Sequence, residues 1–339
     1  MVKETCKIGI IGGGSIGVTL AVALTSIGYD VELVARTIRG VKIDDNYSYT
    51  IKGDFGDKNY LIKTNTKVEE LSENLDFIFI TTKTYDSIEL IERAKCKLCD
   101  DGCFVTIQNV YSLNKISKVL PSSKVICAIL DFNTTNIENI FYVKNFNGIN
   151  LGIYDRDAYS KMILLSNILK NICEVHITKD IVGFIMGRNV INFAISSLGA
   201  ISGLSLGEIL SKKHGKKLFE NLIIEAVNVI KKYNINILPY NNQLNYDDFC
   251  KDTISGKLYR RKVLMLLKHN NGHIKSSALA DLENGIKTEL ACVVEELTNY
   301  SEKSNIDIPS IKKVYSMIKE IESGKRQISE DVFKKELII

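Results

Sequence analysis

The fold is decided near the start of the chain, by the stretch Lys7-Ile8-Gly9-Ile10-Ile11-Gly12-Gly13-Gly14-Ser15-Ile16-Gly17. Its first part, Lys7 to Ile11, is a short run rich in β-branched residues, typical of a strand buried on both faces. The apolar segment from Val18 to Ile27 has the length of a helix and is followed by Gly28. The sequence therefore predicts a strand, a glycine turn and a helix, in that order.

The glycines of this turn have the G-x-G-x-x-G spacing, at Gly12, Gly14 and Gly17. In that motif the first glycine allows a tight turn, the second lets a pyrophosphate approach the backbone, and the third lets the helix pack closely on the strand. The positive end of the helix dipole favours the phosphates. The spacing alone is a weak signal, but its position between a strand and a helix favours a dinucleotide site formed by Gly12, Gly13, Gly14, Ser15, Ile16 and Gly17.

The end of the second predicted strand, over residues 29–35, indicates which nicotinamide cofactor is used. An acidic residue at this place binds the ribose 2′-hydroxyl of NAD, whereas a basic one accepts the 2′-phosphate of NADP. Arg36 occupies the place, Arg39 follows closely, and Glu32 lies earlier in the strand. We therefore expect NADP(H) with Arg36 on the 2′-phosphate, although an ordinary solvated arginine is an alternative.

The pattern of apolar residues divides the chain into two domains. Strands alternate with helical stretches in the first half, which predicts a mostly parallel sheet with strands over 75–81, 103–107 and 124–129 and a helix over 85–98. Beyond residue 178 the spacing becomes helical, which predicts helices over 181–198, 215–233, 255–268, 288–304 and 310–321. We expect an α/β protein with a Rossmann-type NADP-binding domain at 1–178 and an all-α domain for substrate binding and dimerisation at 179–339. A cleft between the two would be a natural ligand site.

Composition limits the classes of partner. The 339 residues include 44 Lys and Arg against 40 Asp and Glu, a net charge of +4 that gives no basis for a nucleic-acid or anionic membrane partner. No stretch has the roughly 18 to 20 uninterrupted apolar residues of a spanning helix, and the N-terminus lacks the pattern of a signal peptide. The eight cysteines, without a secretory context, are expected to be reduced thiols. We expect a cytoplasmic protein.

Three cysteines, Cys96, Cys99 and Cys103, are close enough in sequence to suggest a metal site. Structural zinc sites need four Cys or His ligands, and no fourth lies nearby. We expect no metal, with Cys96 and Cys99 on a surface helix and Cys103 entering the next strand.

Further motifs occur in a fixed order along the chain. They are Thr81-Thr82-Lys83, Gln108-Asn109, Ser276-Ser277-Ala278-Leu279-Ala280-Asp281, Glu283-Asn284-Gly285-Ile286-Lys287-Thr288-Glu289 and Asn305-Ile306-Asp307-Ile308-Pro309. Together with the glycine turn, they resemble the motifs of the ketopantoate reductases, or 2-dehydropantoate 2-reductases, and the resemblance spans the whole chain. It implies NADPH bound between a Rossmann domain and a helical domain, and hydride transfer to the ketone of a 2-oxo acid.

The same resemblance implies roles for individual residues. Lys83 and Asn109 would line the nicotinamide end of the cofactor, and Asn109 would also contact substrate. Glu289 would hold a cofactor hydroxyl, while Asn192 and Ser277 would bind substrate. Each residue also has a structural interpretation, such as a helix cap for Ser277 or a solvated strand end for Lys83.

The sequence departs from the family on the helix that begins near Ile181. The family has Lys-x-x-x-Asn-x-x-x-Asn, whose three side chains project from one helix face. Here the corresponding residues are Phe184, Arg188 and Asn192. Phe184 can neither donate a proton nor stabilise an alkoxide, whereas Arg188 can bind a carboxylate or oxyanion but hardly releases a proton.

Three hypotheses follow from this departure. In the first, the protein reduces a different 2-oxo acid or related carbonyl, with Arg188 holding the substrate anion and Lys83 or a water supplying the proton. In the second, the helix shifts by a residue or more, Asn189 takes part, and ketopantoate reduction survives. In the third, the protein binds NADP(H) without catalysis, as a sensor or accessory protein. We favour the first, with Arg188, Lys83 and Asn192 as catalytic residues and a possible homodimer.

Overall fold

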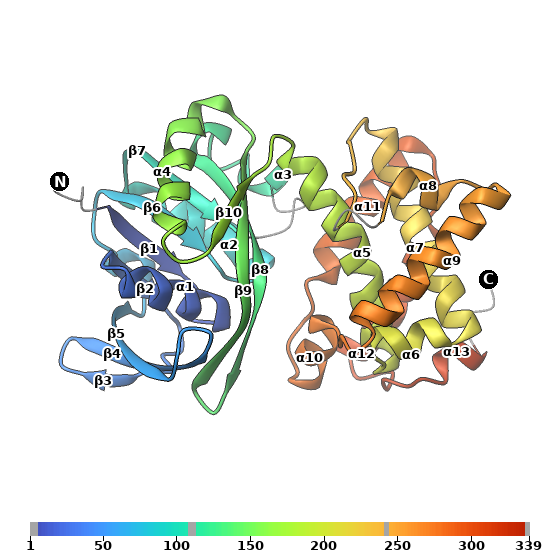
Figure 1. The fold of residues 1–339 in the computed structure, drawn as a ribbon, viewed down its shortest axis with the longest axis horizontal. Helices are drawn as coiled ribbons and strands as arrows, with labels where there is room; N and C mark the ends of the chain where they lie inside the picture. The colour runs from blue at the N-terminus through green and yellow to red at the C-terminus, as the bar shows by residue number, and fades with distance from the viewer. Residues whose placement is uncertain (1–5, 108–112, 241–243, 336–339) are drawn as a thin grey trace. The chain divides into compact units, whose positions relative to one another are not determined.

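The computed structural model describes residues 6–107, 113–240 and 244–335 (Figure 1). The chain divides into two compact units, Met1–Ile181 and Val182–Ile339; the boundary expected from the sequence lies after residue 178. Among the described residues, the first unit contains a sheet with helices, and the second contains helices and one isolated bridge between Tyr240 and Leu244. The predicted fold class, an α/β Rossmann-type unit followed by a helical unit, is confirmed.

The first unit is built on one sheet, which has ten strands in the part of the chain that is described. The strands are β1 (Lys7–Ile11), β2 (Asp30–Val34), β3 (Val41–Ile43), β4 (Asn46–Gly53), β5 (Lys58–Asn65), β6 (Leu75–Ile80), β7 (Leu98–Thr106), β8 (Val125–Ile137), β9 (Ile140–Ile153) and β10 (Glu174–Ile177). Its helices are α1 (Ser15–Ser26), α2 (Thr84–Ala94), α3 (Leu113–Ile116) and α4 (Tyr159–Leu169).

The sheet is mostly parallel and closes on itself. The strand order is β10-β9-β8-β7-β6-β1-β2-β5-β4-β3, and β4 also pairs in parallel with β9. β1 pairs in parallel with β2 and with β6, as the sequence predicts for a Rossmann domain. Antiparallel pairing is found for β3 with β4, β4 with β5 and β8 with β9. The pairing of β4 with β9 therefore closes the sheet into a ring.

This closure explains the composition of α1. Every residue from Gly17 to Leu24 is buried, and the helix contacts β2, β5, β8 and β9 (Figure 1). A helix that is apolar all round is stable only where other elements surround it. The helix begins at Ser15, three residues before the apolar segment predicted from the sequence, because the glycine turn leads directly into its first turn.

One part of the first unit differs from the prediction. The helix expected over 85–98 ends at Ala94, a short 3-10 turn covers Lys95–Lys97, and β7 starts at Leu98. Cys99 therefore lies in a strand, and its placement on a surface helix is wrong. The first residues of β7 are partly or fully exposed and include two aspartates, so they lack the apolar run that marks a buried strand.

The second unit is a helical bundle. Its described helices are α5 (Ile181–Ser202), α6 (Leu206–Ser211), α7 (Lys213–Lys232), α8 (Tyr246–Cys250), α9 (Ile254–Asn271), α10 (Ser277–Glu283), α11 (Leu290–Ser304), α12 (Pro309–Glu322) and α13 (Val332–Lys335). The five helices predicted from the sequence correspond to α5, α7, α9, α11 and α12, the longest of the set. The short helices carry too few turns for a clear helical period.

Helix α5 is a core helix, because most of its length is buried. By length and composition alone it could cross a membrane, but 67% of its most apolar window is buried inside the protein. Arg188, Asn189 and Asn192 also interrupt the apolar sequence. The burial shows a helix packed inside the protein.

Two glycines let other segments approach α5 closely. A Cβ on Gly187 would lie 2.0 Å from the carbonyl oxygen of Leu238, and a Cβ on Gly199 would lie 2.6 Å from Ser276 Oγ. The residues around 238 and 276 are thereby held against the same helix, although they are far apart in the sequence.

A buried carboxylate joins two strands and one loop of the first unit. Glu32, in β2, is 3% exposed. Lys63 Nζ donates to its carboxylate at 2.7 Å, Asn65 Nδ2 at 3.2 Å and the Ser72 backbone N–H at 3.1 Å, and the Ser72 hydroxyl also donates. Burial raises the pKa of Glu32, but the hydrogen bonds from Lys63 and Ser72 outweigh it, so that the pKa lies below its ordinary value.

Replacing Glu32 by Gln is expected to lower the free energy of unfolding by about 1 to 3 kcal/mol near neutral pH, because buried donors lose a charged acceptor. The folded-state pKa is depressed, so this stabilisation is present above the unfolded pKa and is lost as the pH falls through the folded pKa. In urea unfolding, the difference between wild type and variant should be constant around neutral pH and shrink below about pH 4.5.

The control for this experiment is Glu89→Gln. Glu89 is exposed on α2 and pairs with Arg93 at 3.3 Å, a kind of surface pair worth roughly 0 to 1 kcal/mol. Equal losses in the two variants, unchanged by pH, would contradict the role assigned to Glu32.

Candidate functional site

Three glycines, two in the turn between β1 and α1 and one in the first turn of α1, are packed tightly against their surroundings. Gly12 has a φ of +127°, which L side chains rarely adopt. A Cβ on Gly17 would lie 1.8 Å from the Gly12 carbonyl oxygen, and a Cβ on Gly13 would lie 2.3 Å from the Ala35 Cβ. Thr81 Oγ1, just beyond β6, donates to the Gly12 carbonyl at 3.0 Å. These contacts fix the turn between the ends of β2 and β6.

Gly14 differs from these glycines, because the space that a side chain at this position would occupy is open. Apart from its chain neighbours, no described atom lies within 4 Å of a Cβ built on Gly14, and its φ of −76° suits any residue. It is the N-cap of α1, and the first turn of the helix has no acidic residue. The first N–H groups of a helix lack partners within the helix and lie at the positive end of its dipole. Open space at this point fits a phosphate that approaches the backbone closely.

The residues Ser15 and Ile16 complete the predicted pyrophosphate loop. Ser15 is half-buried as the first residue of α1, and Ile16 is 36% exposed. Both therefore lie at the accessible N-terminal end of the helix, beside Gly14.

Two arginines lie near this turn, and each has a different partner. Arg39 Nη1 donates to the Gly13 carbonyl oxygen at 3.0 Å. Arg36 Nη2 lies 3.0 Å from Asp86 Oδ2, and the Arg36 side chain is 87% exposed. The Glu32 carboxylate accepts a hydrogen bond from Lys63 inside the unit. The end of β2 thus presents a guanidinium, with Asp86 beside it, where a ribose-binding acid would stand in an NAD site.

Lys83 is the N-cap residue of α2 and is half-buried. It follows Thr81, which holds the glycine turn, so the Thr81-Thr82-Lys83 motif lies beside the predicted cofactor loop. Asn109 lies outside the described residues, as does Gln108.

In the second unit, α5 presents three predicted residues on one face. Phe184 and Arg188 are half-buried and Asn192 is exposed, whereas the residues between them are largely buried. Side chains four apart lie one above the other on a helix. The structure therefore places Phe184, Arg188 and Asn192 on the outward face of α5.

Asn189 does not share this face. It is 6% exposed, and its Nδ2 makes no hydrogen bond with the described residues. The hypothesis of a shifted helix requires Asn189 to reach the substrate, and it stays a hypothesis; in this structure the Asn189 side chain is buried.

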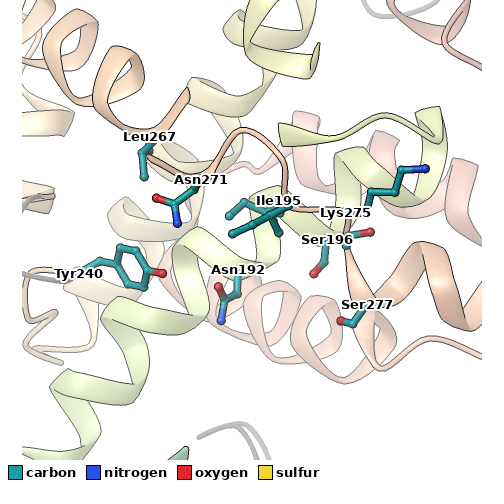
Figure 2. Close-up of a pocket in the computed structure, with 10 residues that line it drawn as sticks. Asn192, Ile195, Ser196, Tyr240, Leu267, Asn271, Lys275 and Ser277 are labelled. Carbon is teal, nitrogen blue, oxygen red and sulfur yellow. The ribbon is translucent and has the colours of Figure 1, made fainter. Parts of the chain in front are cut away.

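A pocket of about 220 Å³ opens beside Asn192. Asn192 and Ser277, predicted from distant parts of the sequence, both line it. Figure 2 shows the Tyr240 hydroxyl directed toward the space near Asn192 and Asn271, while the Lys275 side chain extends away from Asn192. The other lining residues are Ile195, Ser196, Leu267, Ile274 and Ser276. Arg188 and Phe184, one and two turns before Asn192, are not among them.

Sequence reasoning missed several of these polar residues. Ser196 lies four residues after Asn192, so the helical spacing used for residues 184, 188 and 192 could have found it. Tyr240, Asn271 and Lys275 come from loops and from the end of α9, and carried no motif. Only the fold brings them to the pocket.

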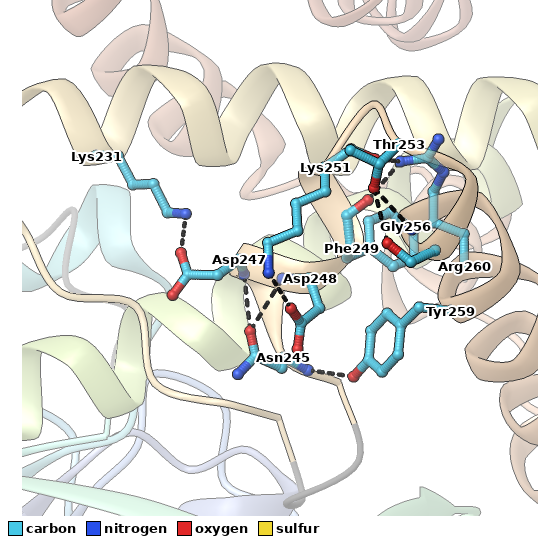
Figure 3. Close-up of polar contacts among 11 residues, drawn as sticks. Lys231, Asn245, Asp247, Asp248, Phe249, Lys251, Thr253, Gly256, Tyr259 and Arg260 are labelled. Carbon is cyan, nitrogen blue, oxygen red and sulfur yellow. Dashed lines mark hydrogen bonds and ion pairs between the residues drawn. The ribbon is translucent and has the colours of Figure 1, made fainter.

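A network of polar contacts joins Asn245 and α8 to α9 (Figure 3). Asn245 caps α8, since its Oδ1 accepts from the backbone N–H of Asp247 at 2.9 Å, and its own backbone N–H donates to the Tyr259 hydroxyl at 2.8 Å. Arg260, 8% exposed, donates to the Phe249 carbonyl at 2.6 Å. These contacts join α8 to α9, whose last residues line the pocket.

Ser276 and Ser277 begin α10. Ser276 Oγ accepts from the Leu279 backbone N–H at 3.0 Å, so Ser276 is the cap. Ser277 is exposed and lines the pocket. Glu289 directly precedes α11, is half-buried, and is not among the pocket residues.

The three cysteines considered for a metal site do not share one set of contacts. Cys96 donates to the Arg93 carbonyl, and Cys103 is buried. Cys99 instead lies with Asp76 and Asp101, a group that could hold a metal ion. Lys161 Nζ already pairs with the two carboxylates, at 3.2 and 3.0 Å. The expectation of no metal at the cysteines stays a prediction.

Comparison with known proteins identifies the relatives of this chain. The profile of the ketopantoate reductase PanE/ApbA family matches residues 8–156, and the profile of its C-terminal part matches residues 180–322. The 2-dehydropantoate 2-reductase of Aquifex aeolicus is 23% identical over 317 residues, which cover 91% of this chain and 95% of the relative. That of Pyrococcus abyssi is 23% identical over 316 residues, which cover 92% and 97%.

Solved structures with the same fold include a ketopantoate reductase from Ralstonia eutropha, with a TM-score of 0.77 at 15% identity over 95% of this chain and 100% of that one. A dimeric ketopantoate reductase from Staphylococcus aureus has a TM-score of 0.72 at 14% identity, over 94% and 100%. D-mandelate dehydrogenase, in a ternary structure with NADH and anilino(oxo)acetate, has a TM-score of 0.76 at 15% identity, over 94% and 99%.

The two profiles together span most of both units, and the relatives match nearly end to end. The chain therefore belongs to the ketopantoate reductase family, whose members are oxidoreductases acting on a CH-OH or C=O group.

Proposed function

We propose that this protein is an NADP(H)-dependent reductase that transfers a hydride from NADPH to the ketone of a 2-oxo acid. One observation carries the proposal. Gly14, at the N-terminus of α1, has open space where a side chain would be, although the glycines around it are tightly packed. Family membership supports the reaction class, and D-mandelate dehydrogenase shows that this fold can hold a nicotinamide dinucleotide.

The backbone from Gly12 to Gly17 would hold the pyrophosphate, and Arg36 would bind the 2′-phosphate. Lys83 and Asn109 would line the nicotinamide end, and Glu289 would hold a cofactor hydroxyl. When bound, the cofactor supplies the hydride. The protein's task is to place it, since hydride transfer depends mainly on orientation and on the charges around the reacting carbonyl.

The substrate would bind beside the outward face of α5. Arg188 would hold the carboxylate through charge-assisted hydrogen bonds, and Asn192, Ser277 and Asn109 would donate to or accept from the rest of the molecule. Lys83 or a water would supply the proton to the developing alkoxide. A pocket of about 220 Å³ suits a small organic acid. Phe184 cannot serve as the acid, so we propose a 2-oxo acid other than ketopantoate as the preferred substrate.

The direct test is NADPH oxidation by the purified protein with a panel of 2-oxo acids that includes ketopantoate. We expect turnover with at least one member and slow turnover of ketopantoate. Rapid reduction of ketopantoate would refute the interpretation of Phe184. Tight NADPH binding without turnover of any carbonyl would instead favour a catalytically silent binding protein.

With the best substrate of this panel, Arg188→Met tests the carboxylate site. We expect KM to rise about thirtyfold or more, the effect of roughly 2 kcal/mol lost when a paired charge is removed. An unchanged KM would remove Arg188 from the substrate site.

Gly14→Ala tests the cofactor site without disturbing the packing. The added methyl group meets no described atom within 4 Å, so thermal unfolding should change little, whereas a phosphate could no longer approach the backbone. We expect the Kd for NADPH, measured by titration calorimetry, to rise by at least about tenfold, or about 1.4 kcal/mol.

The matched control is Gly28→Ala, at the other end of α1. Gly28 also has open space around it, but its φ of +90° is strained for alanine. This variant should lose some stability and keep its NADPH affinity. If Gly14→Ala also keeps its affinity, the turn is not the pyrophosphate site.

We also propose a homodimer, because one structural neighbour, from S. aureus, is a dimeric enzyme. Sedimentation equilibrium should then give a molar mass near twice the 38.0 kDa of the chain. A mass of one chain at micromolar concentration would refute it. A cytoplasmic location remains part of the proposal.

A further inference from the structure

An ion pair at the end of β2 involves the arginine proposed for the 2′-phosphate. Arg36 Nη2 lies 3.0 Å from Asp86 Oδ2, and the two side chains are 87% and 30% exposed. The partners are fifty residues apart in the sequence. The guanidinium that would receive the phosphate therefore already has an anionic partner.

Asp86 is held in place by its own helix. It lies in the first turn of α2, where the helix dipole favours a negative charge, and its backbone N–H donates to the Lys83 carbonyl at 3.1 Å. Arg36 is the more exposed of the two partners and has a long, rotatable side chain. Arg36 therefore has to leave Asp86, or share its donors with it, when it turns toward another anion.

The second arginine near the turn does not have this conflict. Arg39 donates to the Gly13 carbonyl oxygen, a neutral acceptor, at 3.0 Å. Lys63, the cation on the neighbouring strand, is bound to Glu32. Asp86 is thus the carboxylate paired with Arg36, and its negative charge lies close to the place of a 2′-phosphate.

A carboxylate and a phosphate compete for the same guanidinium N–H groups. Like charges a few ångströms apart also repel each other. A ribose that ends in a 2′-hydroxyl meets neither obstacle, because the hydroxyl is neutral and can donate a hydrogen bond to a carboxylate. Asp86 therefore disfavours the phosphorylated cofactor more than the unphosphorylated one.

We propose that Asp86 is a specificity-determining residue that narrows the preference for NADPH over NADH by competing with the 2′-phosphate for Arg36. The proposal rests on the cofactor site described under the proposed function. With Asp86 present, the protein would select NADPH over NADH less strongly than it would with Arg36 alone.

The test is Asp86→Asn, with the Kd values of NADPH and NADH measured by titration calorimetry. Asparagine keeps the shape of the side chain and removes its charge. We expect NADPH to bind about three- to tenfold more tightly, because an exposed ion pair and a nearby like charge are each worth about 1 kcal/mol or less. NADH affinity should change less than about twofold. The gain should shrink at high salt, since exposed charges are screened.

The matched control is Glu89→Gln, which removes the same charge one turn further along α2. Glu89 pairs with Arg93 rather than with Arg36. We expect less than about a twofold change for either cofactor. If Glu89→Gln strengthens NADPH binding as much as Asp86→Asn does, the effect is one of general charge, and direct competition is refuted.

Arg36→Met, alone and combined with Asp86→Asn, separates this proposal from the one on which it rests. We expect Arg36→Met to weaken NADPH binding and to remove most of the gain from Asp86→Asn. If Arg36→Met weakens NADPH binding but Asp86→Asn leaves the ratio of the two Kd values unchanged, only the role of Asp86 is overturned. If Arg36→Met has no effect, Arg36 does not bind the 2′-phosphate and the proposal for Asp86 falls with that role. If wild type binds neither nucleotide, the cofactor site itself is wrong and both proposals fall.

Discussion

The first unit depends on the close contact between Gly17 in α1 and the carbonyl oxygen of Gly12. A side chain at either glycine would push the helix away from the ends of β1 and β6. Because the contact is maintained, the N-terminus of α1 is held at the carboxyl ends of the central strands, with Gly14 facing open space. The closed ring of strands then surrounds the rest of the helix. One steric constraint therefore sets both the packing of an apolar helix and the place of the helix end that we propose to bind the phosphates.

The sequence predicted those strands that are buried on both faces. β1, β6 and the first half of β8 are near-continuous apolar runs, β2 has three apolar residues among its five, and the positions of these strands agree with the predictions. The second half of β8 alternates between more and less exposed residues, and β4 and β5 are only partly buried. Such strands carry a weak local signal. The pairing of β4 with β9 joins segments about ninety residues apart, and no local pattern encodes it.

The site was predictable to the extent that it depends on local geometry. Helical spacing was enough to place Phe184, Arg188 and Asn192 on one face, and family motifs were enough to relate Asn192 to Ser277. Tyr240 and Lys275 reach the pocket only because Gly187 and Gly199 let distant segments pack against α5. Asp86, the partner of Arg36, could not be predicted for the same reason. The fold brings the end of β2 and the start of α2 together, although they are far apart in the sequence.

The proposed cofactor site and the proposed substrate site differ in how well their residues match the motifs that the sequence resembles. The glycine turn has close packing at Gly12 and Gly17 and open space at Gly14, whereas α5 has Phe184 at the place where the motif that the sequence resembles would have a lysine. Lysine supplies a charge and a proton, but arginine at neutral pH supplies only the charge. In the proposed site, Arg188 would therefore supply the positive charge for an anionic substrate, but it would not deliver the proton. The pocket also contains Lys275 and Tyr240, so groups able to release a proton do line it. A reductase with the proposed site would select its substrate by where the proton source lies relative to the carbonyl.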